Sequence, residues 1–274
     1  GRLLRLPKTN DKCGDATMSE KSWNSPAGRR ARVLCLGGGS ICSALMDPLL
    51  GMGCGVAVVD RDRRCQVAER CQVRTLDEDI WAEGRPSLVL GEAITTAEEI
   101  LDRSEIDLLV PSIPGHAMGR LAMAWSGGRL SPRGSTAVLE ALNSALSGRG
   151  LAAMDPENGT LVCTLNTGPV RCPADCPQGE VCPITGRPRE LDMDQVLKGL
   201  IGQLSLKGLV IRPMRLGNYG VITDGQLKEV RALLNGLEEG DAVAIATSCA
   251  CHGIMNTFKV RYGDGGEGRG HGGQ

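Results

Sequence analysis

The sequence predicts an α/β protein in which a domain built on a parallel sheet is followed by a smaller, cysteine-rich α+β domain. Three observations carry this prediction. Apolar runs of strand length alternate with segments at helical spacing up to about residue 146, which is typical of a parallel sheet covered on both faces. Three consecutive glycines follow the first apolar run. Beyond residue 150, cysteines and prolines gather in one loop.

On composition, the chain divides into four segments. Residues 1–29 have no periodic apolar pattern, and we expect them to be disordered. The parallel-sheet domain takes residues 30–150, and the cysteine-rich domain takes residues 151–262. Residues 263–274 form a glycine-rich tail, which we also expect to be disordered.

The first domain opens with a strand, a glycine turn, a helix and a second strand. The strand is expected at Ala31–Leu36, and the helix after it has apolar residues at helical spacing. The second strand, Val56–Val59, is closed by Asp60. Further strands are expected at 87–90 and 106–111, with helices at 96–103, 115–125 and 136–146. The helix at 96–103 is predicted to begin at a capping box of Thr96 and Glu99.

The glycine turn has the composition of a phosphate-binding turn. Gly37 and Gly39 occupy the first two positions of the G-x-G-x-x-G pattern, while Cys42 stands at the third. Backbone N–H groups at a helix N-terminus attract a phosphate, and glycines let it approach closely. Gly38 and Ser40 belong to the same candidate site. An empty tight turn is the alternative interpretation.

Residues 31–60 resemble the Rossmann NAD(P)-binding superfamily at Gly37, Gly39 and Asp60. The turn is also similar to the N-terminal domain of sirohaem synthases. The resemblance implies that Asp60 binds the adenosine ribose, which favours NAD. The neighbouring arginines at 61, 63 and 64 favour NADP instead, so both cofactors stay open. Residues 151–262 resemble no family that we can name.

The second domain is expected to contain a strand at 159–168, helices at 192–204 and 224–237, and strands at 208–216 and 242–247. Thr223 and Gln226 predict a capping box for the second of these helices. A cysteine-rich turn follows Thr247, and the segment after it is predicted to be either a helix or a strand.

Five cysteines of the second domain are candidate metal ligands. Cys172, Cys176 and Cys182 are each followed by proline, and Cys249 and Cys251 lie in the later turn. Thiolates that converge repel each other unless a cation or cluster neutralises them. We therefore expect an iron–sulfur cluster or a zinc ion, with disulfides or free thiols as the alternative. Cys163 is a further candidate ligand. The two loops would meet if the strands carrying Cys163 and Thr247 were neighbours.

Two histidines are candidate catalytic residues. His116 follows the strand at 106–111, at the edge where ligands of parallel sheets bind, and could move a proton. Local hydrogen bonding at a helix start is the alternative. His252 adjoins the cysteine turn, where it would act as a ligand, a supporting group or an acid–base residue.

Composition narrows the function classes. The chain has 31 basic and 32 acidic residues and 2% aromatic residues, which argues against nucleic-acid binding. No apolar run reaches the length of a membrane span, and the start lacks a secretory apolar core. We expect a cytoplasmic protein with no membrane association.

These observations predict an NAD(P)-dependent oxidoreductase with a cysteine-ligated metal or iron–sulfur centre, acting on a small-molecule substrate or a redox partner protein. Two alternatives stay open. One is a non-enzymatic regulatory protein that senses nucleotide and metal, and the other is a tetrapyrrole- or metal-handling enzyme. Whether the protein is an enzyme is itself open at this stage.

Overall fold

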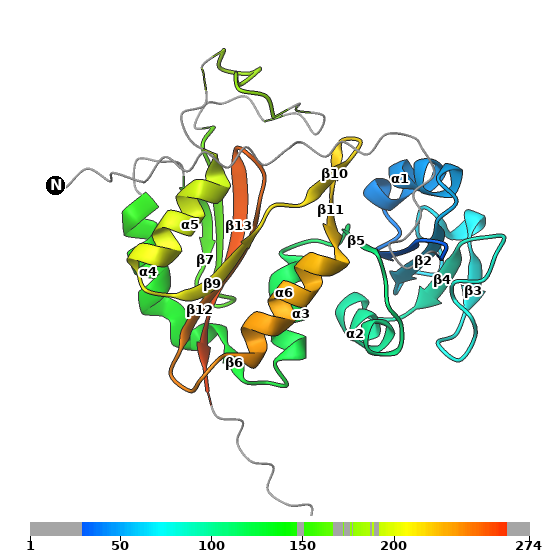
Figure 1. Ribbon diagram of the computed structural model, residues 1–274, viewed down its shortest axis with the longest axis horizontal. Helices are drawn as coiled ribbons and strands as arrows, with labels where there is room; N and C mark the ends of the chain where they lie inside the picture. The colour runs from blue at the N-terminus through cyan, green and yellow to red at the C-terminus, as the bar shows by residue number, and fades with distance from the viewer. Residues whose placement is uncertain are drawn as a thin grey trace, which may run out of the picture.

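The computed structural model describes residues 29–146, 151–166, 172, 176, 178–186, 188 and 192–261. These residues form a mixed α/β protein with two mixed sheets and six α-helices (Figure 1). The disorder expected for residues 1–28 and 263–274 lies outside the described residues. Arg29, which the sequence placed in the disordered N-terminal segment, forms an ion pair of 2.8 Å with Asp107.

The first sheet has seven strands in the order β10-β11-β5-β1-β2-β4-β3. The strands β1, β2, β3, β4 and β5 pair in parallel, while the hairpin β10–β11 is added antiparallel to β5. Their bounds are β1 Arg32–Leu36, β2 Gly55–Asp60, β3 Gln72–Arg74, β4 Ser87–Leu90, β5 Leu108–Pro111, β10 Met214–Leu216 and β11 Tyr219–Thr223.

The second sheet has the order β7-β8-β13-β12-β9, and a short strand β6 also pairs with β13. All its pairs are antiparallel except that of β9 with β12. The bounds are β6 Leu130–Ser131, β7 Leu151–Asp155, β8 Thr160–Thr164, β9 Lys207–Ile211, β12 Ala242–Ser248 and β13 His252–Val260.

The helices separate and cover the two sheets. Their bounds are α1 Ser40–Gly51, α2 Ala93–Arg103, α3 Ala117–Trp125, α4 Thr136–Leu146, α5 Met193–Gln203 and α6 Asp224–Asn235, with 3-10 turns at Ala68–Arg70 and Pro132–Ser135. Buried residues of α1 pack on one face of the first sheet, and those of α4 and α5 pack on the outer face of the second. Between the sheets lie α3 and α6 (Figure 1).

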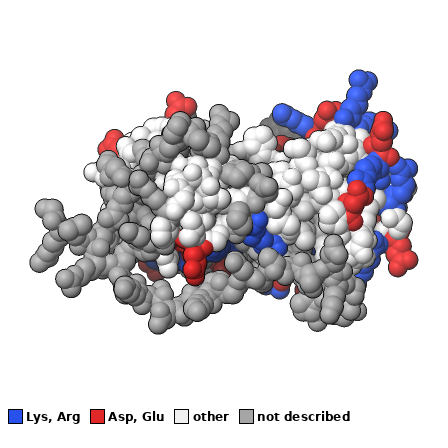
Figure 2. Space-filling model, turned by 90° about the horizontal axis from the view of Figure 1, so that it is seen from above, with Lys and Arg blue, Asp and Glu red and all other residues white. Residues whose placement is uncertain are grey.

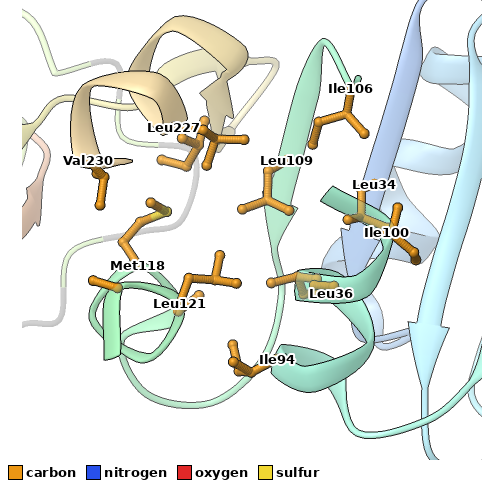
Figure 3. Close-up of a cluster of buried hydrophobic side chains, with 14 of the residues drawn as sticks. Leu34, Leu36, Ile94, Ile100, Ile106, Leu109, Met118, Leu121, Leu227 and Val230 are labelled. Atoms are coloured by element: carbon orange, nitrogen blue, oxygen red, sulfur yellow. The ribbon is translucent and has the colours of Figure 1, made fainter. Parts of the chain in front are cut away.

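One apolar core joins the two sheets. Figure 3 shows side chains of β1, β5, α2, α3 and α6 meeting in it, among them Leu36, Leu109, Met118 and Leu227. The same core continues into the second sheet through Ile245 and Phe258. Because both sheets bury a face in this core, the helices between them are shared.

The structure corrects several sequence predictions. The helix predicted from Thr96 begins earlier, at Ala93, because the Glu92 carboxylate accepts hydrogen bonds from two backbone N–H groups of the first turn. The single strand expected at 208–216 is divided at Arg212–Pro213 into β9 and β10, which belong to different sheets. The segment after the cysteine turn is a strand. The capping box of Thr223 and Gln226 is confirmed.

The chain also crosses between the sheets more than once. Strand β6 joins the second sheet, although it precedes residue 150, and the hairpin β10–β11 returns to the first. The first sheet is therefore mixed rather than purely parallel, because its last two strands come from the second half of the chain.

Candidate functional site

The structure brings the cysteine loop and the cysteine turn together at one end of the second sheet. Strand β8 pairs with β13, so the chain leaves β8 beside the turn, and the Leu165 N–H donates to the Cys251 carbonyl at 2.8 Å. The chain returns to the same turn at α5, where the Met193 N–H donates to the Ala250 carbonyl at 2.8 Å. Both ends of the loop are thus fixed to the turn. The strands of Cys163 and Thr247 are not neighbours, because β13 lies between them.

Polar contacts fix two described residues of the loop, Gln178 to the turn and Cys176 to β10. The Ala250 N–H donates to Gln178 Oε1 at 3.1 Å, and the Arg215 guanidinium donates to the Cys176 carbonyl at 2.7 Å. Burial raises the pKa of Cys172 to about 12, together with a hydrogen bond to Cys176 and the nearby thiols of Cys251 and Cys249. The thiols of Cys249 and Cys251 therefore lie near enough to Cys172 to oppose its ionisation.

The turn itself stabilises a thiolate. The His252 N–H donates to Cys249 Sγ at 3.3 Å, and His252 Nδ1 lies 3.7 Å from the same sulfur. Burial opposes ionisation, but hydrogen bonds from the His252 side chain and from the N–H groups of Cys251 and His252 lower the pKa of Cys249. The hydrogen bond to Cys249 in turn raises the pKa of His252, against the effect of its burial. The arrangement favours a thiolate–imidazolium pair.

Among the described residues, no three Cys, His, Asp or Glu side chains are arranged to hold a metal ion. The thiols of the loop and the turn lie near one another without converging on one point. Thiol side chains and backbone N–H groups that stabilise sulfur charge are the donor types that thiophilic metals prefer. Cys182 lies close enough to His252 to influence its pKa.

Cys163 stands apart from this cluster. Its side chain is fully buried in the core under α4 and α5, and burial raises its pKa to about 12. It acts as a small apolar side chain.

The glycine turn lies at the carboxyl ends of β1 and β5. Gly37 has φ +92°, and a Cβ there would lie 3.0 Å from the Ser112 carbonyl oxygen. Ser112 Oγ donates to the carbonyl oxygens of Leu36 and Gly37 at 2.6 and 2.9 Å. The first glycine is thus required by its close packing against the end of β5.

The second glycine is covered by the chain that follows β2. A Cβ at Gly38 would lie 2.4 Å from Cys65 Sγ, and the Val67 N–H donates to the Gly38 carbonyl at 3.3 Å. Gly39 has open space around its Cα, and Ser40 is exposed. The open space at the start of α1 therefore lies beside Gly39 and Ser40 rather than at Gly37 or Gly38.

The Asp60 carboxylate already has partners. Its two oxygens accept from the Gly38 N–H at 2.7 Å and the Asp62 N–H at 2.8 Å. It therefore holds the glycine turn in place by hydrogen bonds, a role that sequence reasoning did not foresee.

Basic and acidic side chains are interspersed over this end of the molecule (Figure 2), and Arg70 forms an ion pair with Asp47.

His116 is buried between the sheets. Its Nδ1 lies 2.7 Å from Asn256 Oδ1, and its Nε2 is buried without a hydrogen-bond partner among the described residues. Burial lowers the pKa of His116 to about 4, although the bond to Asn256 opposes this shift. The side chain is only 5% exposed, so a substrate would reach it only if the two sheets separated.

Sequence reasoning missed Arg215, which binds the Cys176 carbonyl from β10, and Gln178, a loop residue whose side chain accepts from the Ala250 N–H. No local sequence pattern points to Arg215, because its contact joins it to Cys176, 39 residues earlier in the chain.

The fold and this cluster describe an α/β protein with a thiol-rich junction at one end of its second sheet. No helix in the described part of the chain could span a membrane. The family model AF_1314_C, described as "Uncharacterized protein, C-terminal domain", matches residues 122–261, just over half of the chain, and the chain belongs to this family. The match includes both cysteine segments. No curated protein and no solved structure matches the chain.

Proposed function

We propose that this chain is a redox metalloprotein that holds an iron–sulfur cluster at its cysteine junction. The cysteine junction is the place where the loop of Cys172, Cys176 and Cys182 meets the turn of Cys249 and Cys251. The observation that supports this most is the anchoring of both ends of the cysteine loop to the turn of Cys249–Cys251. Such anchoring confines thiols from two distant segments to one place, and a thiophilic centre relieves the repulsion of their charged forms.

The residues of the cysteine junction would bind the centre and influence its reduction potential. The N–H groups of Cys251 and His252 donate to Cys249, and hydrogen bonds to cluster sulfurs raise the reduction potential. The centre would pass one electron to, or take one from, a redox partner protein. One partner is oxidised as the other is reduced, and no bond breaks.

The test is anaerobic purification followed by metal analysis and a visible spectrum. The variants are Cys249→Ser with Cys251→Ser, and Cys65→Ser as a control that removes a thiol elsewhere. We expect iron and broad visible absorption in the wild type and the control, and loss of both in the double variant. A colourless protein with stoichiometric zinc would replace the redox role by a structural one. Absence of any metal after reconstitution with iron and sulfide, or with zinc, would reject the site.

A second candidate function, NAD(P) binding in a Rossmann-type domain, is favoured by the open space at Gly39 beside the start of α1. NAD and NADP are titrated separately into the wild type and into Gly39→Leu, whose side chain would fill that space. Saturable binding that Gly39→Leu abolishes supports the nucleotide site. Equal affinity of the wild type and Gly39→Leu for the nucleotide argues against the site. The roles of Asp60 and His116 in such a reaction stay predictions.

A further inference from the structure

The second glycine of the glycine turn is covered by the segment that follows β2, residues 61–67, which we call the closing segment. The Gly38 N–H donates to the Asp60 carboxylate at 2.7 Å, and the Gly38 carbonyl accepts from the Val67 N–H at 3.3 Å. Both backbone polar groups of this glycine are therefore bonded to the chain between the end of β2 and Val67.

Side chains of the closing segment also fill the space beside the Gly38 Cα. A Cβ on Gly38 would overlap Cys65 Sγ and would lie 3.0 Å from Val67 Cγ2. In a dinucleotide-binding turn this space belongs to the pyrophosphate, because the second glycine lets the phosphates approach the backbone. The Asp60 carboxylate places a negative charge at the N–H that a phosphate would otherwise bind. The turn therefore does not fit a pyrophosphate while the closing segment lies on Gly38.

The closing segment buries little of its own surface. Its exposed side chains are Arg61, Asp62, Arg63, Arg64 and Gln66. Cys65 is half-buried, and Val67 alone is fully buried. Segments with few buried apolar contacts open at a low cost in free energy. The stretch ahead of Val67 thus has the properties of a strap that can leave the turn while Val67 stays in the core.

We infer that the closing segment autoinhibits the nucleotide site, so that NAD or NADP binds only in a conformation in which Cys65 has moved away from Gly38. This inference rests on the second candidate function, NAD(P) binding, because it names a regulation of that same site. The measured affinity is then the affinity of the open conformation multiplied by the fraction of the protein that is open.

The first experiment measures nucleotide affinity. NADH and NADPH are titrated into the wild type, into Cys65→Ala, and into Cys54→Ala, which removes a thiol at the opposite end of β2. We expect Cys65→Ala to bind about 10-fold more tightly than the wild type, and Cys54→Ala to bind like the wild type. Circular dichroism confirms that both variants are folded.

The outcomes separate the inference from the function on which it rests. Binding with equal affinities in the wild type and Cys65→Ala would overturn the role of the closing segment and leave the nucleotide site standing. If no protein binds either nucleotide, the nucleotide function fails and the inference fails with it.

The second experiment follows the movement of the segment in the wild type. The rate at which iodoacetamide alkylates Cys65 is measured by mass spectrometry with and without saturating NADH. Because the open conformation exposes this thiol, NADH should speed its alkylation by about 10-fold. The Cys54 thiol is fully buried and should stay unreactive in both states. Unchanged or slower alkylation of Cys65 in the loaded protein would show that the nucleotide binds without moving the segment, and would overturn the inference.

Discussion

At the scale of single residues, the contact of His116 with Asn256 joins α3 to the middle of the second sheet. Asn256 Nδ2 donates to the Asn158 carbonyl at 3.0 Å and to Thr160 Oγ1 at 2.8 Å. The Oδ1 atom of Asn256 is therefore the acceptor that faces His116, and the imidazole proton must lie on Nδ1. The buried Nε2 lone pair has no partner in the described part of the chain, so protonation there would place a charge in the core.

This contact predicts a pH dependence of folding stability. The pKa of His116 is about 4 in the folded state and about 6.5 in the unfolded chain. As the pH falls from 6.5 to 4, the unfolded chain binds a proton that the folded state does not, so stability decreases by up to about 3 kcal/mol. Urea denaturation across this range measures the effect. In His116→Gln, the loss of unfolding free energy between pH 6.5 and pH 4 should be smaller by this amount. An equal loss in both proteins would contradict the burial of a neutral His116.

Gly119 permits the same contact. A Cβ at this position would lie 2.1 Å from Asn256 Oδ1, and Asn256 is held by its other hydrogen bonds. Gly119→Ala should therefore destabilise the protein by about 1–3 kcal/mol despite the better helix propensity of alanine. Gly202 on α5 has open space around it and is the matched control, since Gly202→Ala should stabilise by up to about 1 kcal/mol. Chemical denaturation of both variants makes the comparison.

At the scale of elements, the segment from β9 to β10 links the two sheets and supports the cysteine junction. Arg212 lies where β9 ends and forms ion pairs with Asp192 and Asp194 at the start of α5, at 2.7 and 3.4 Å. Arg215, on β10, reaches the Cys176 carbonyl. The break at Pro213 lets one continuous segment contribute to both sheets, because proline has no N–H to continue a ladder.

Removing the Arg215 side chain should weaken the cysteine junction and leave the fold intact. The Cys176 carbonyl would lose its donor, and we expect Arg215→Ala to bind metal about 10-fold more weakly. Lys228→Ala on the exposed face of α6 removes an equal charge whose ion pair is with Asp224, and it should leave metal affinity unchanged. Competition with a chelator measures both affinities. Equal affinities in the two variants would show that Arg215 does not support the site.

At the scale of the whole molecule, the two sheets share one core. Leu227 and Val230 of α6 lie against Met118 and Leu121 of α3 between the sheets (Figure 3). The hairpin β10–β11 adds to the edge of β5. Residues on both sides of position 150 are thus needed to bury the core.

A fragment of residues 30–150 should therefore not fold by itself, because it would expose the faces of α3 and β5 that α6 and β11 cover. The full chain should unfold in a single calorimetric transition. The fragment is tested by near-ultraviolet circular dichroism and amide hydrogen exchange. Protection like that of the full chain would favour two independently folding domains, divided where the composition changes.

The sequence by itself determined the local elements of this protein. Periodicity located β1, β2, β5 and most helices, and Thr223 with Gln226 marked the start of α6, because these signals depend on neighbours within a few residues. The bunching of Cys172, Cys176 and Cys182 predicted a metal-binding loop, and that stays a prediction. Only the tertiary structure decided that both ends of the cysteine loop meet the turn of Cys249–Cys251, that His116 is buried, and that Cys65 covers Gly38. Those facts follow from strand order and from packing between segments far apart in the chain, which no local pattern records.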